Sequence, residues 1–109
     1  MSLDEKRCTP CEGNTPPLPE NEEEKLFSQI QGWELKRDGI HRIEKQYSLK
    51  DFREAMLFVN KIAEIANTED HHPDIFISYS KVRITLSTHA VNGLSENDFI
   101  VASKIDKEK

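Results

Sequence analysis

The most regular pattern of apolar positions lies in the middle of the chain. Between residues 49 and 66, apolar side chains recur every three or four positions, which is the spacing of one face of an α-helix. They are Leu49, Phe52, Ala55, Met56, Val59, Ile62, Ala63 and Ala66. The pattern predicts a long helix that opens within residues 48–51 and runs to about residue 67, and we expect it to be the main core helix.

Four shorter segments carry the signals of β-strands. They cover residues 33–37, about 40–48, 74–79 and 81–87. The last of them alternates most cleanly between apolar and polar side chains. Asp38-Gly39 predicts a two-residue type I′ turn between the first two strands, because both positions of that turn need positive φ. A turn centred on Ser80 is predicted to join the last two strands.

Capping signals predict a further helix at each end of this series. Asn21 and Glu24 have the spacing of a capping box, which predicts a first helix over about residues 21–31. Its acidic first turn is interpreted as a solvated helix start. Ser95 and Asp98 have the same spacing and predict a last helix that starts at Ser95. The elements then follow in the order αββαββα, which indicates an α+β domain.

Length, composition and charge limit the classes of protein to which this chain can belong. The 109 residues suit one domain, and 36% hydrophobic with 32% charged residues is typical of a soluble globular chain. The net charge of −5 argues against a general nucleic-acid binder, since phosphate binding needs clustered Lys and Arg. The sequence has no apolar run of the ~20 residues that span a bilayer, and no signal-peptide pattern at its start. We therefore expect a cytoplasmic protein that binds neither nucleic acid nor membrane.

The first residues differ from the rest of the chain. Residues 1–19 are rich in Pro and turn formers and are expected to be a flexible leader, which leaves residues 20–109 as the folded domain. The leader holds Cys8 and Cys11 in a single C-x-x-C motif. A zinc ribbon needs a second such pair, and the chain has only two Cys. We interpret the motif as two thiols in a leader, with half of an intermolecular metal site or a redox pair as the alternative.

Three of the four histidines flank the second predicted hairpin. His71 and His72 come directly before its first strand, and His89 follows its second strand. Paired residues of an antiparallel hairpin have a constant number sum. A turn at Ser80 makes that sum about 160, which places His71 opposite His89. Three imidazoles are therefore expected together at the open end of the hairpin, whereas His41 is predicted to lie exposed on the second strand.

Gathered imidazoles suit acid–base chemistry, because histidine gains and loses a proton near neutral pH. A zinc site is the rival interpretation. Neighbouring residues of an extended chain point to opposite sides, so His71 and His72 are poorly placed to share one ion. The H-E-x-x-H motif is also missing from the sequence. The prediction is an acid–base site that acts on a small molecule and holds no metal.

The histidines and their neighbours resemble the pterin-4a-carbinolamine dehydratase family. The matching stretches are His71–Ile75, Tyr79–Val82, Leu86–His89 and Gly93–Asp98, with Gly32-Trp33 and Asp51–Ala55 upstream. The resemblance covers roughly residues 20–106. It implies one four-stranded antiparallel sheet with three helices on one face, a homodimer or homotetramer, and no metal or organic cofactor.

The resemblance also implies a reaction. The expected substrate is 4a-hydroxytetrahydrobiopterin, the pterin-4a-carbinolamine, which loses water to give quinonoid dihydropterin in tetrahydrobiopterin recycling. His71 and His89 are then the expected acid–base pair and His72 positions the pterin, although the sequence leaves the three roles interchangeable. The candidate substrate-binding residues are Asp70, Ser87, Thr88 and Asp98. Backbone groups of Ser87 and Thr88 are expected near the pterin ring, while Asp98 is already explained as a helix-start residue.

The match has one departure, and two other functions stay open. Many family members carry an acidic residue four positions before the first histidine, where this chain has Asn67. An amide forms hydrogen bonds but does not accept a proton as a carboxylate does.

Some members bind a homeodomain transcription factor and stabilise its dimers, so an interaction module is one alternative. A relative that binds pterin-like compounds of molybdopterin metabolism without this turnover is the other.

Overall fold

Four antiparallel strands form one sheet in this computed structural model, which describes residues 2–10 and 15–109. The strands are β1 (Glu34–Lys36), β2 (Arg42–Ser48), β3 (Asp74–Ser78) and β4 (Lys81–Leu86). Their order across the sheet is β1-β2-β4-β3, so the two hairpins meet where β2 pairs with β4. This pairing places β1 and β3 at the edges.

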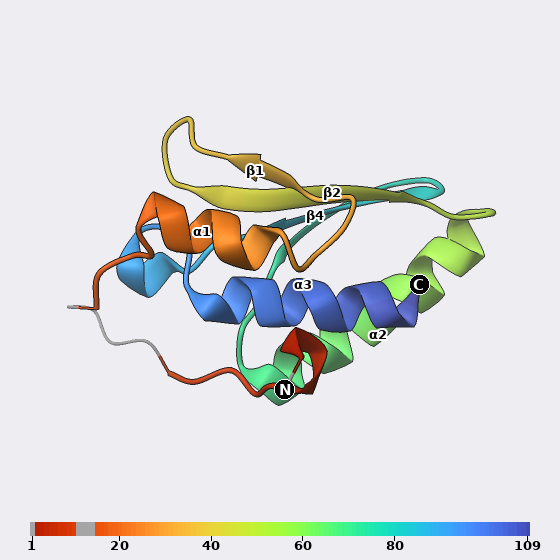
Figure 1. Ribbon diagram of the computed structural model, residues 1–109. Coiled ribbons are helices and arrows are strands. Elements are labelled where there is room, and N and C mark those ends of the chain that lie inside the picture. Colours follow the sequence, from red (N-terminus) through yellow and green to blue (C-terminus); the bar gives the residue numbers. More distant parts are fainter. Residues whose placement is uncertain (1, 11–14) are drawn as a thin grey trace.

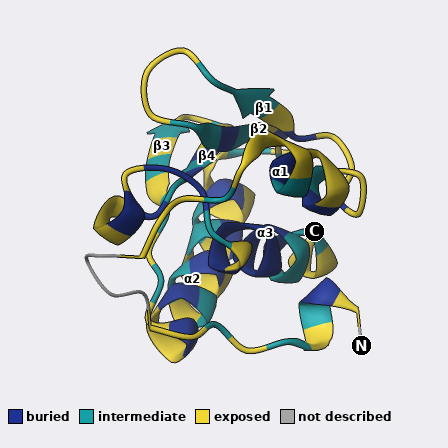
Figure 2. Ribbon diagram, turned by 60° about the vertical axis from the view of Figure 1, so that its left-hand side comes forward, coloured by how far each residue is buried: buried dark blue, intermediate teal, exposed yellow. Residues whose placement is uncertain are grey.

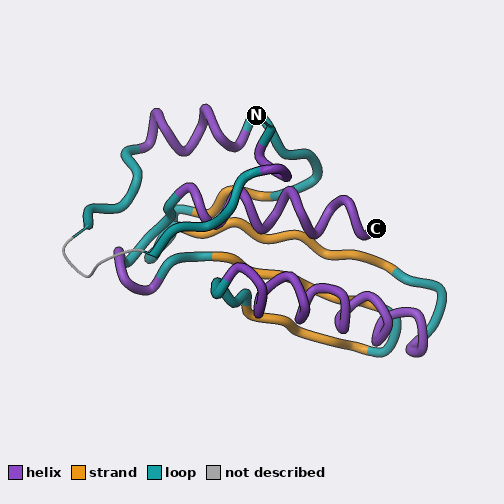
Figure 3. Tube along the Cα trace, turned by 90° about the horizontal axis from the view of Figure 1, so that it is seen from below, coloured by secondary structure: helices purple, strands orange, loops and turns teal. Residues whose placement is uncertain are grey.

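Three helices cover one face of the sheet (Figure 1). They are α1 (Glu20–Phe27), α2 (Phe52–Glu69) and α3 (Glu96–Glu108), and two single 3₁₀ turns accompany them, η1 (Leu3–Glu5) and η2 (His89–Val91). Viewed from below, α3 lies between α1 and α2 (Figure 3). The predicted α+β class, the antiparallel sheet, the placement of the helices and the order αββαββα are confirmed.

The core lies between the sheet and the helices, where buried residues face one another (Figure 2). From the sheet it takes the alternate side chains of β4, namely Val82, Ile84 and Leu86. The strongest contribution from a helix is that of α3, which is buried over most of its length. Because α3 is packed on several sides, its first turn is held rigidly, and that turn belongs to the site described below.

The long helix forms close to its predicted position. Its N-cap is Asp51, whose carboxylate accepts a hydrogen bond from the amide of Glu54 at 2.9 Å. The helix runs to Glu69, two residues beyond the predicted end. Ala55, Ile62 and Ala66 of the predicted stripe are buried. Phe52 is half exposed, and Phe58 and Glu69, which lie outside the stripe, are buried as well.

The first helix is shorter than predicted. It begins at Glu20 with Pro19 at the N-cap, not with Asn21, and it ends at Phe27. The acidic first turn is also not fully solvated. Glu23 is completely buried, with Arg37 at 3.0 Å and His41 at 2.8 Å from its carboxylate. Both partners come from the loop between β1 and β2 and stabilise the buried carboxylate. The sequence of the helix alone does not predict them.

The first hairpin has a longer turn than the predicted type I′. Residues 37–41 connect β1 to β2, and only Gly39 among them has positive φ, at 81°. The guanidinium of Arg42 donates to the carbonyls of Asp38 and Ile40 at 2.9 and 3.1 Å, which stabilises a wider loop. His41 consequently lies in this loop, half-buried, and not exposed on the strand.

The expected leader lies partly within the described residues. Leu3 is buried and belongs to the core cluster, and Cys8 is half-buried, whereas Cys11 lies outside the described residues. Within the described part of the chain, no helix is both long and apolar enough to cross a membrane.

Candidate active site

A depression of about 380 Å³ opens at one end of the domain, where four separate segments of the chain meet. Its lining comes from the N-terminal segment, the α2–β3 connection, the end of β4 with η2, and the first turn of α3. The lining residues are Thr9, Pro10, Asp70, His71, His72, Ser87, Thr88, His89, Ala90 and Asn97. All three predicted catalytic histidines and three of the four substrate-binding candidates therefore lie in one place.

The end of α2 sets the position of the first two histidines. Asp70 adopts a left-handed conformation with φ of 52°, which stops the helix, and the amide of His71 donates back to the carbonyl of Ala66 at 3.1 Å. Pro73 then restricts His72 to an extended conformation and leads directly into β3. His71 and His72 thus stand at a sharp bend between a helix and a strand.

The expected strand pairing of His71 with His89 does not form. The observed register places Asp74 opposite Thr85, and β3 begins only there. After β4, Thr88 pairs with Gly93 instead, through a hydrogen bond of 2.7 Å from its amide, and the intervening residues form η2. His89 and His71 share the depression because both chain segments bend toward it.

One histidine is fixed by a buried carboxylate. Nε2 of His71 lies 2.7 Å from Oδ1 of Asp98, which is completely buried, and the His71 side chain is only 11% exposed. The other carboxylate oxygen accepts hydrogen bonds from the hydroxyl of Thr88 at 2.7 Å and from the amide of Ser95 at 3.0 Å. An ionised carboxylate only accepts hydrogen bonds, so Nε2 of His71 carries a hydrogen in this contact, and in the neutral imidazole Nδ1 then has the lone pair.

The first turn of α3 holds this carboxylate in place. Ser95 is the N-cap and Asp98 the third residue of a capping box, as predicted, and the Ser95 hydroxyl lies 2.8 Å from that of Thr88. Asp98 does not line the depression but lies behind His71. The spacing of Ser95 and Asp98 predicts the cap but not the contact of Asp98 with His71, because that contact joins segments 27 residues apart.

The other two histidines are more exposed to solvent. His72 is exposed, and its Nε2 lies 3.0 Å from Oδ1 of Asn67 in the last turn of α2. Asn67 therefore provides a hydrogen-bond partner where many family members are expected to have a carboxylate. His89 is exposed at the start of η2. The site combines one fixed, nearly buried imidazole with two at its rim.

The thiol beside the site is not poised to react. Burial, and next the negative charges of Glu69 and Asp98, raise the pKa of Cys8 to about 12. The nucleophilic form of cysteine is the thiolate, so this thiol stays protonated at neutral pH. No group of three His, Cys, Asp or Glu among residues 2–10 and 15–109 has the arrangement of a metal site.

Comparison with known proteins gives a consistent match. A family model described as pterin 4 alpha carbinolamine dehydratase matches residues 16–108. A Nitrosomonas eutropha protein is 46% identical over 105 residues, which are 95% of this chain and 90% of that protein. A Nitrosospira multiformis protein is 48% identical over 101 residues, 93% of this chain and 87% of that protein. Both carry the name "putative pterin-4-alpha-carbinolamine dehydratase".

Solved structures share the fold. A transcriptional coactivator/pterin dehydratase from Brucella melitensis is 36% identical, with a TM-score of 0.79 over 84% of this chain and 97% of that one. A pterin dehydratase-like protein described as a RuBisCO assembly factor in the alpha-carboxysome is 18% identical, with a TM-score of 0.61 over 72% of this chain and 89% of that one. The second likeness concerns the fold alone.

Proposed function

The chain belongs to the pterin 4 alpha carbinolamine dehydratase family, and from this premise we propose that it dehydrates 4a-hydroxytetrahydrobiopterin to quinonoid dihydropterin by histidine acid–base catalysis. The observation that carries the proposal is the His71–Asp98 pair beside two further imidazoles in one depression. A volume of about 380 Å³ is suitable for a small heterocycle. The proposed setting is tetrahydrobiopterin recycling in the cytoplasm, by a homodimer or homotetramer.

The reaction needs two proton transfers. The C4a hydroxyl leaves as water once its oxygen receives a proton, and N5 loses its proton as the C4a–N5 double bond forms. The substrate thus loses one hydroxyl and one hydrogen, and the catalyst is unchanged overall. Each transfer needs a group that exchanges protons near neutral pH, which describes imidazole.

We assign the base to His71. Its Nε2–H points to Asp98, so the Nδ1 lone pair is available to accept the N5 proton. The imidazolium formed in that step is stabilised by the buried carboxylate 2.7 Å away. Asp98 is thereby a positioning residue, and we favour this role over the expected direct contact with substrate because its side chain is completely buried.

We assign the acid to His89 and the positioning of the pterin to His72. An exposed imidazole recovers its proton from solvent after each turnover, which suits the group that protonates the leaving oxygen. His72 is held by Asn67 at the rim, where it can contact a flat ring. Among the other candidates, the backbone of Thr88 is paired with Gly93, so Ser87 and Asp70 are the better substrate contacts.

The test is the rate of dehydration of 4a-hydroxytetrahydrobiopterin generated in situ. Wild-type protein is expected to exceed the spontaneous rate, and His71→Ala and His89→Ala are each expected to lower kcat by ~10²–10⁴-fold, the usual contribution of general acid–base catalysis. The matched control is His41→Gln, which replaces a histidine outside the depression and keeps a donor for Glu23. We expect it to stay within about twofold of wild type, since it changes no group of the site.

Two results would count against the proposal. Folded wild-type protein that gives no acceleration would exclude the dehydratase activity, and binding of a reduced pterin without turnover would then support a binding module. Wild-type rates in both histidine variants would leave the activity in place but exclude the acid–base roles.

A further inference from the structure

The first residues of the chain form a strap against the helices. Residues 2–10, called here the N-terminal strap, lie before the family match, which begins at residue 16. The strap runs along the side of the helical layer that faces away from the sheet (Figures 1 and 3). The end of the strap that lies away from the depression, called its far end, is anchored by Leu3, which is 3% exposed and belongs to the core. The near end is the one at Thr9 and Pro10, which line the depression.

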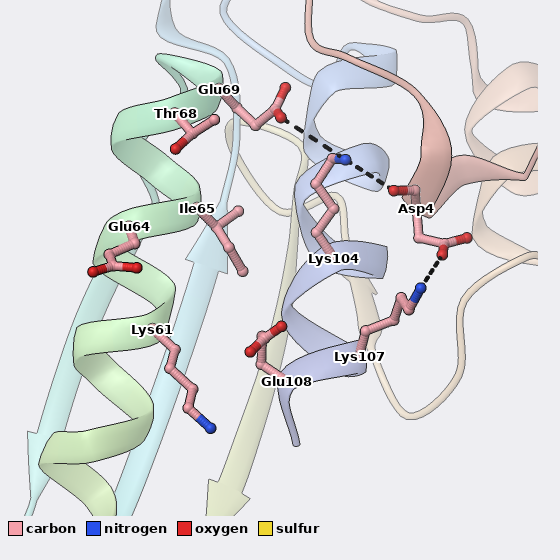
Figure 4. A pocket seen from close by; sticks show the side chains of 9 residues that line it. All are labelled: Asp4, Lys61, Glu64, Ile65, Thr68, Glu69, Lys104, Lys107 and Glu108. Carbon is pink, nitrogen blue, oxygen red and sulfur yellow. Dashed lines mark hydrogen bonds and ion pairs between the residues drawn. The ribbon is translucent and has the colours of Figure 1, made fainter.

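Charged groups of α3 secure this far end (Figure 4). The ammonium group of Lys104 donates to the carbonyl of Asp4 at 2.8 Å, and Lys107 pairs with the Asp4 carboxylate at 2.9 Å. Lys104 also lies 3.8 Å from the carboxylate of Glu69, the last residue of α2. One lysine therefore connects the strap to the helix end from which His71 follows.

The near end of the strap is held by two buried polar side chains. The carboxylate of Glu69, 5% exposed, accepts a hydrogen bond from the amide of Cys8 at 2.8 Å. The carboxamide of Asn97 binds the backbone of Thr9 twice, accepting from its amide at 3.1 Å and donating to its carbonyl at 2.7 Å. Buried polar groups need such partners, so these side chains favour an ordered strap at this point.

These contacts lie next to both members of the His71–Asp98 pair. Glu69 stands two residues before His71, and Asn97 directly precedes Asp98. Beyond them, Thr9 and Pro10 continue along the rim and line the depression together with the histidines. The strap thus supplies two of the residues that line the depression.

We propose that the N-terminal strap is a substrate-binding wall of the active site and that it determines affinity for the pterin without taking part in the proton transfers. We expect the strap to affect substrate affinity and not proton transfer because Asp98, which orients His71, is held by Thr88 and Ser95. Neither of these residues belongs to the strap. Loss of the strap then removes contacts made equally in the ground state and the transition state, which raises KM and leaves kcat unchanged. The inference rests on the proposed dehydratase function.

The experiment compares three variants in the dehydration assay. Deletion of residues 2–10 is expected to raise KM about tenfold, equivalent to about 1.4 kcal/mol of lost contact, with kcat within about twofold of wild type. Asn97→Leu keeps the Leu3 anchor and the Glu69–Cys8 hydrogen bond but removes both hydrogen bonds to the Thr9 backbone, so a smaller rise of about threefold is expected. Lys6→Ala is the control, because it removes only a solvent-exposed ion pair with Glu96, which contributes little to holding the strap, and KM should not change.

A second measurement separates the inference from the proposed function. The dissociation constant of 7,8-dihydrobiopterin, which cannot undergo the dehydration, should rise with KM in the deletion and Asn97→Leu variants. If wild type accelerates dehydration but both variants keep its KM and dissociation constant, the strap inference is wrong and the proposed function stands. A fall in kcat alone would also overturn it, since that indicates a structural role. If wild type shows no acceleration, the proposed function fails, and the dissociation constants alone decide the inference.

Discussion

Replacement of Asp98 by Asn tests whether the buried carboxylate sets the hydrogen position on His71. The two side chains have nearly the same shape, but an amide has one accepting oxygen where a carboxylate has two. The oxygen facing Ser95 and Thr88 receives two hydrogen bonds, from an amide and a hydroxyl. The Asn oxygen is expected to occupy that position, which turns its NH₂ group toward Nε2 of His71. His71 must then carry its hydrogen on Nδ1, the atom proposed as the base.

The size of the effect follows from these contacts. Turning the amide the other way sacrifices two hydrogen bonds of ~1 kcal/mol each, so the wrong tautomer is favoured by about 2 kcal/mol, or about 30-fold. Loss of the negative charge beside the imidazolium costs about a further 1.4 kcal/mol, or about tenfold. We expect kcat of Asp98→Asn to fall by about 300-fold, which lies within the range of general acid–base catalysis. KM should change little, because Asp98 is completely buried.

The assay is steady-state dehydration kinetics together with ¹⁵N NMR of the His71 ring, which reports directly which nitrogen carries the hydrogen. Thr88→Val is the matched control, since it removes one donor to Asp98 but leaves the carboxylate facing His71, and a loss of at most about tenfold is expected. Thermal unfolding checks that both variants are folded. A folded Asp98→Asn protein with kcat within about threefold of wild type, or with the hydrogen still on Nε2, would refute the reasoning.

Three further predictions concern the surroundings of the site. Asn67→Ala removes a neutral hydrogen bond to His72 of ~0.5–1.5 kcal/mol, so kcat/KM should fall only about two- to tenfold, as kinetics can show. Burial disfavours the charge of Glu69, but the strap amide and neighbouring cations outweigh it and lower its pKa. The stability advantage of wild type over Glu69→Gln in urea unfolding should therefore be full above pH 4.5, the ordinary pKa, and vanish as pH falls through the lowered value. Gly93→Ala places a Cβ 2.9 Å from Pro17, which should cost about 1–3 kcal/mol and lower the melting temperature.

Local signals predicted the parts of the fold that local interactions determine. The repeat of apolar residues placed α2, because one helix face packs on the core, and the Ser95 cap placed the start of α3. Where tertiary contacts compete, prediction failed. Glu23 is buried because Arg37 and His41 come to it from another loop, and the hairpin turn widens because a guanidinium binds its carbonyls. Arg37 and His41 lie 14 and 18 residues from Glu23, whereas Arg42 directly follows the loop whose carbonyls it binds, so the widened turn is a local departure that the Asp-Gly signal alone does not predict.

The histidines could be placed together from the sequence, but not their individual surroundings. The order of helix, turn and hairpin brings His71 and His89 to the same end of the domain whatever the register, so the expectation survived an error in the pairing. Their environments depend on side chains from α2 and α3. Asn67 contacts one imidazole and Asp98 another, which makes otherwise similar residues chemically different.

A complete structural explanation for Asp98 did not exclude a second role, and the reason lies in the two oxygens of its carboxylate. Capping the helix uses Oδ2, which accepts from the Ser95 amide, and leaves Oδ1 for another donor. His71 occupies that position at 2.7 Å. The start of α3 therefore fixes the position of the Asp98 carboxylate, and the carboxylate fixes the orientation of the His71 imidazole. The position of the proposed base thus depends on how α3 packs against the core. A variant that loosens the first turn of α3 should consequently lower kcat before it unfolds the domain.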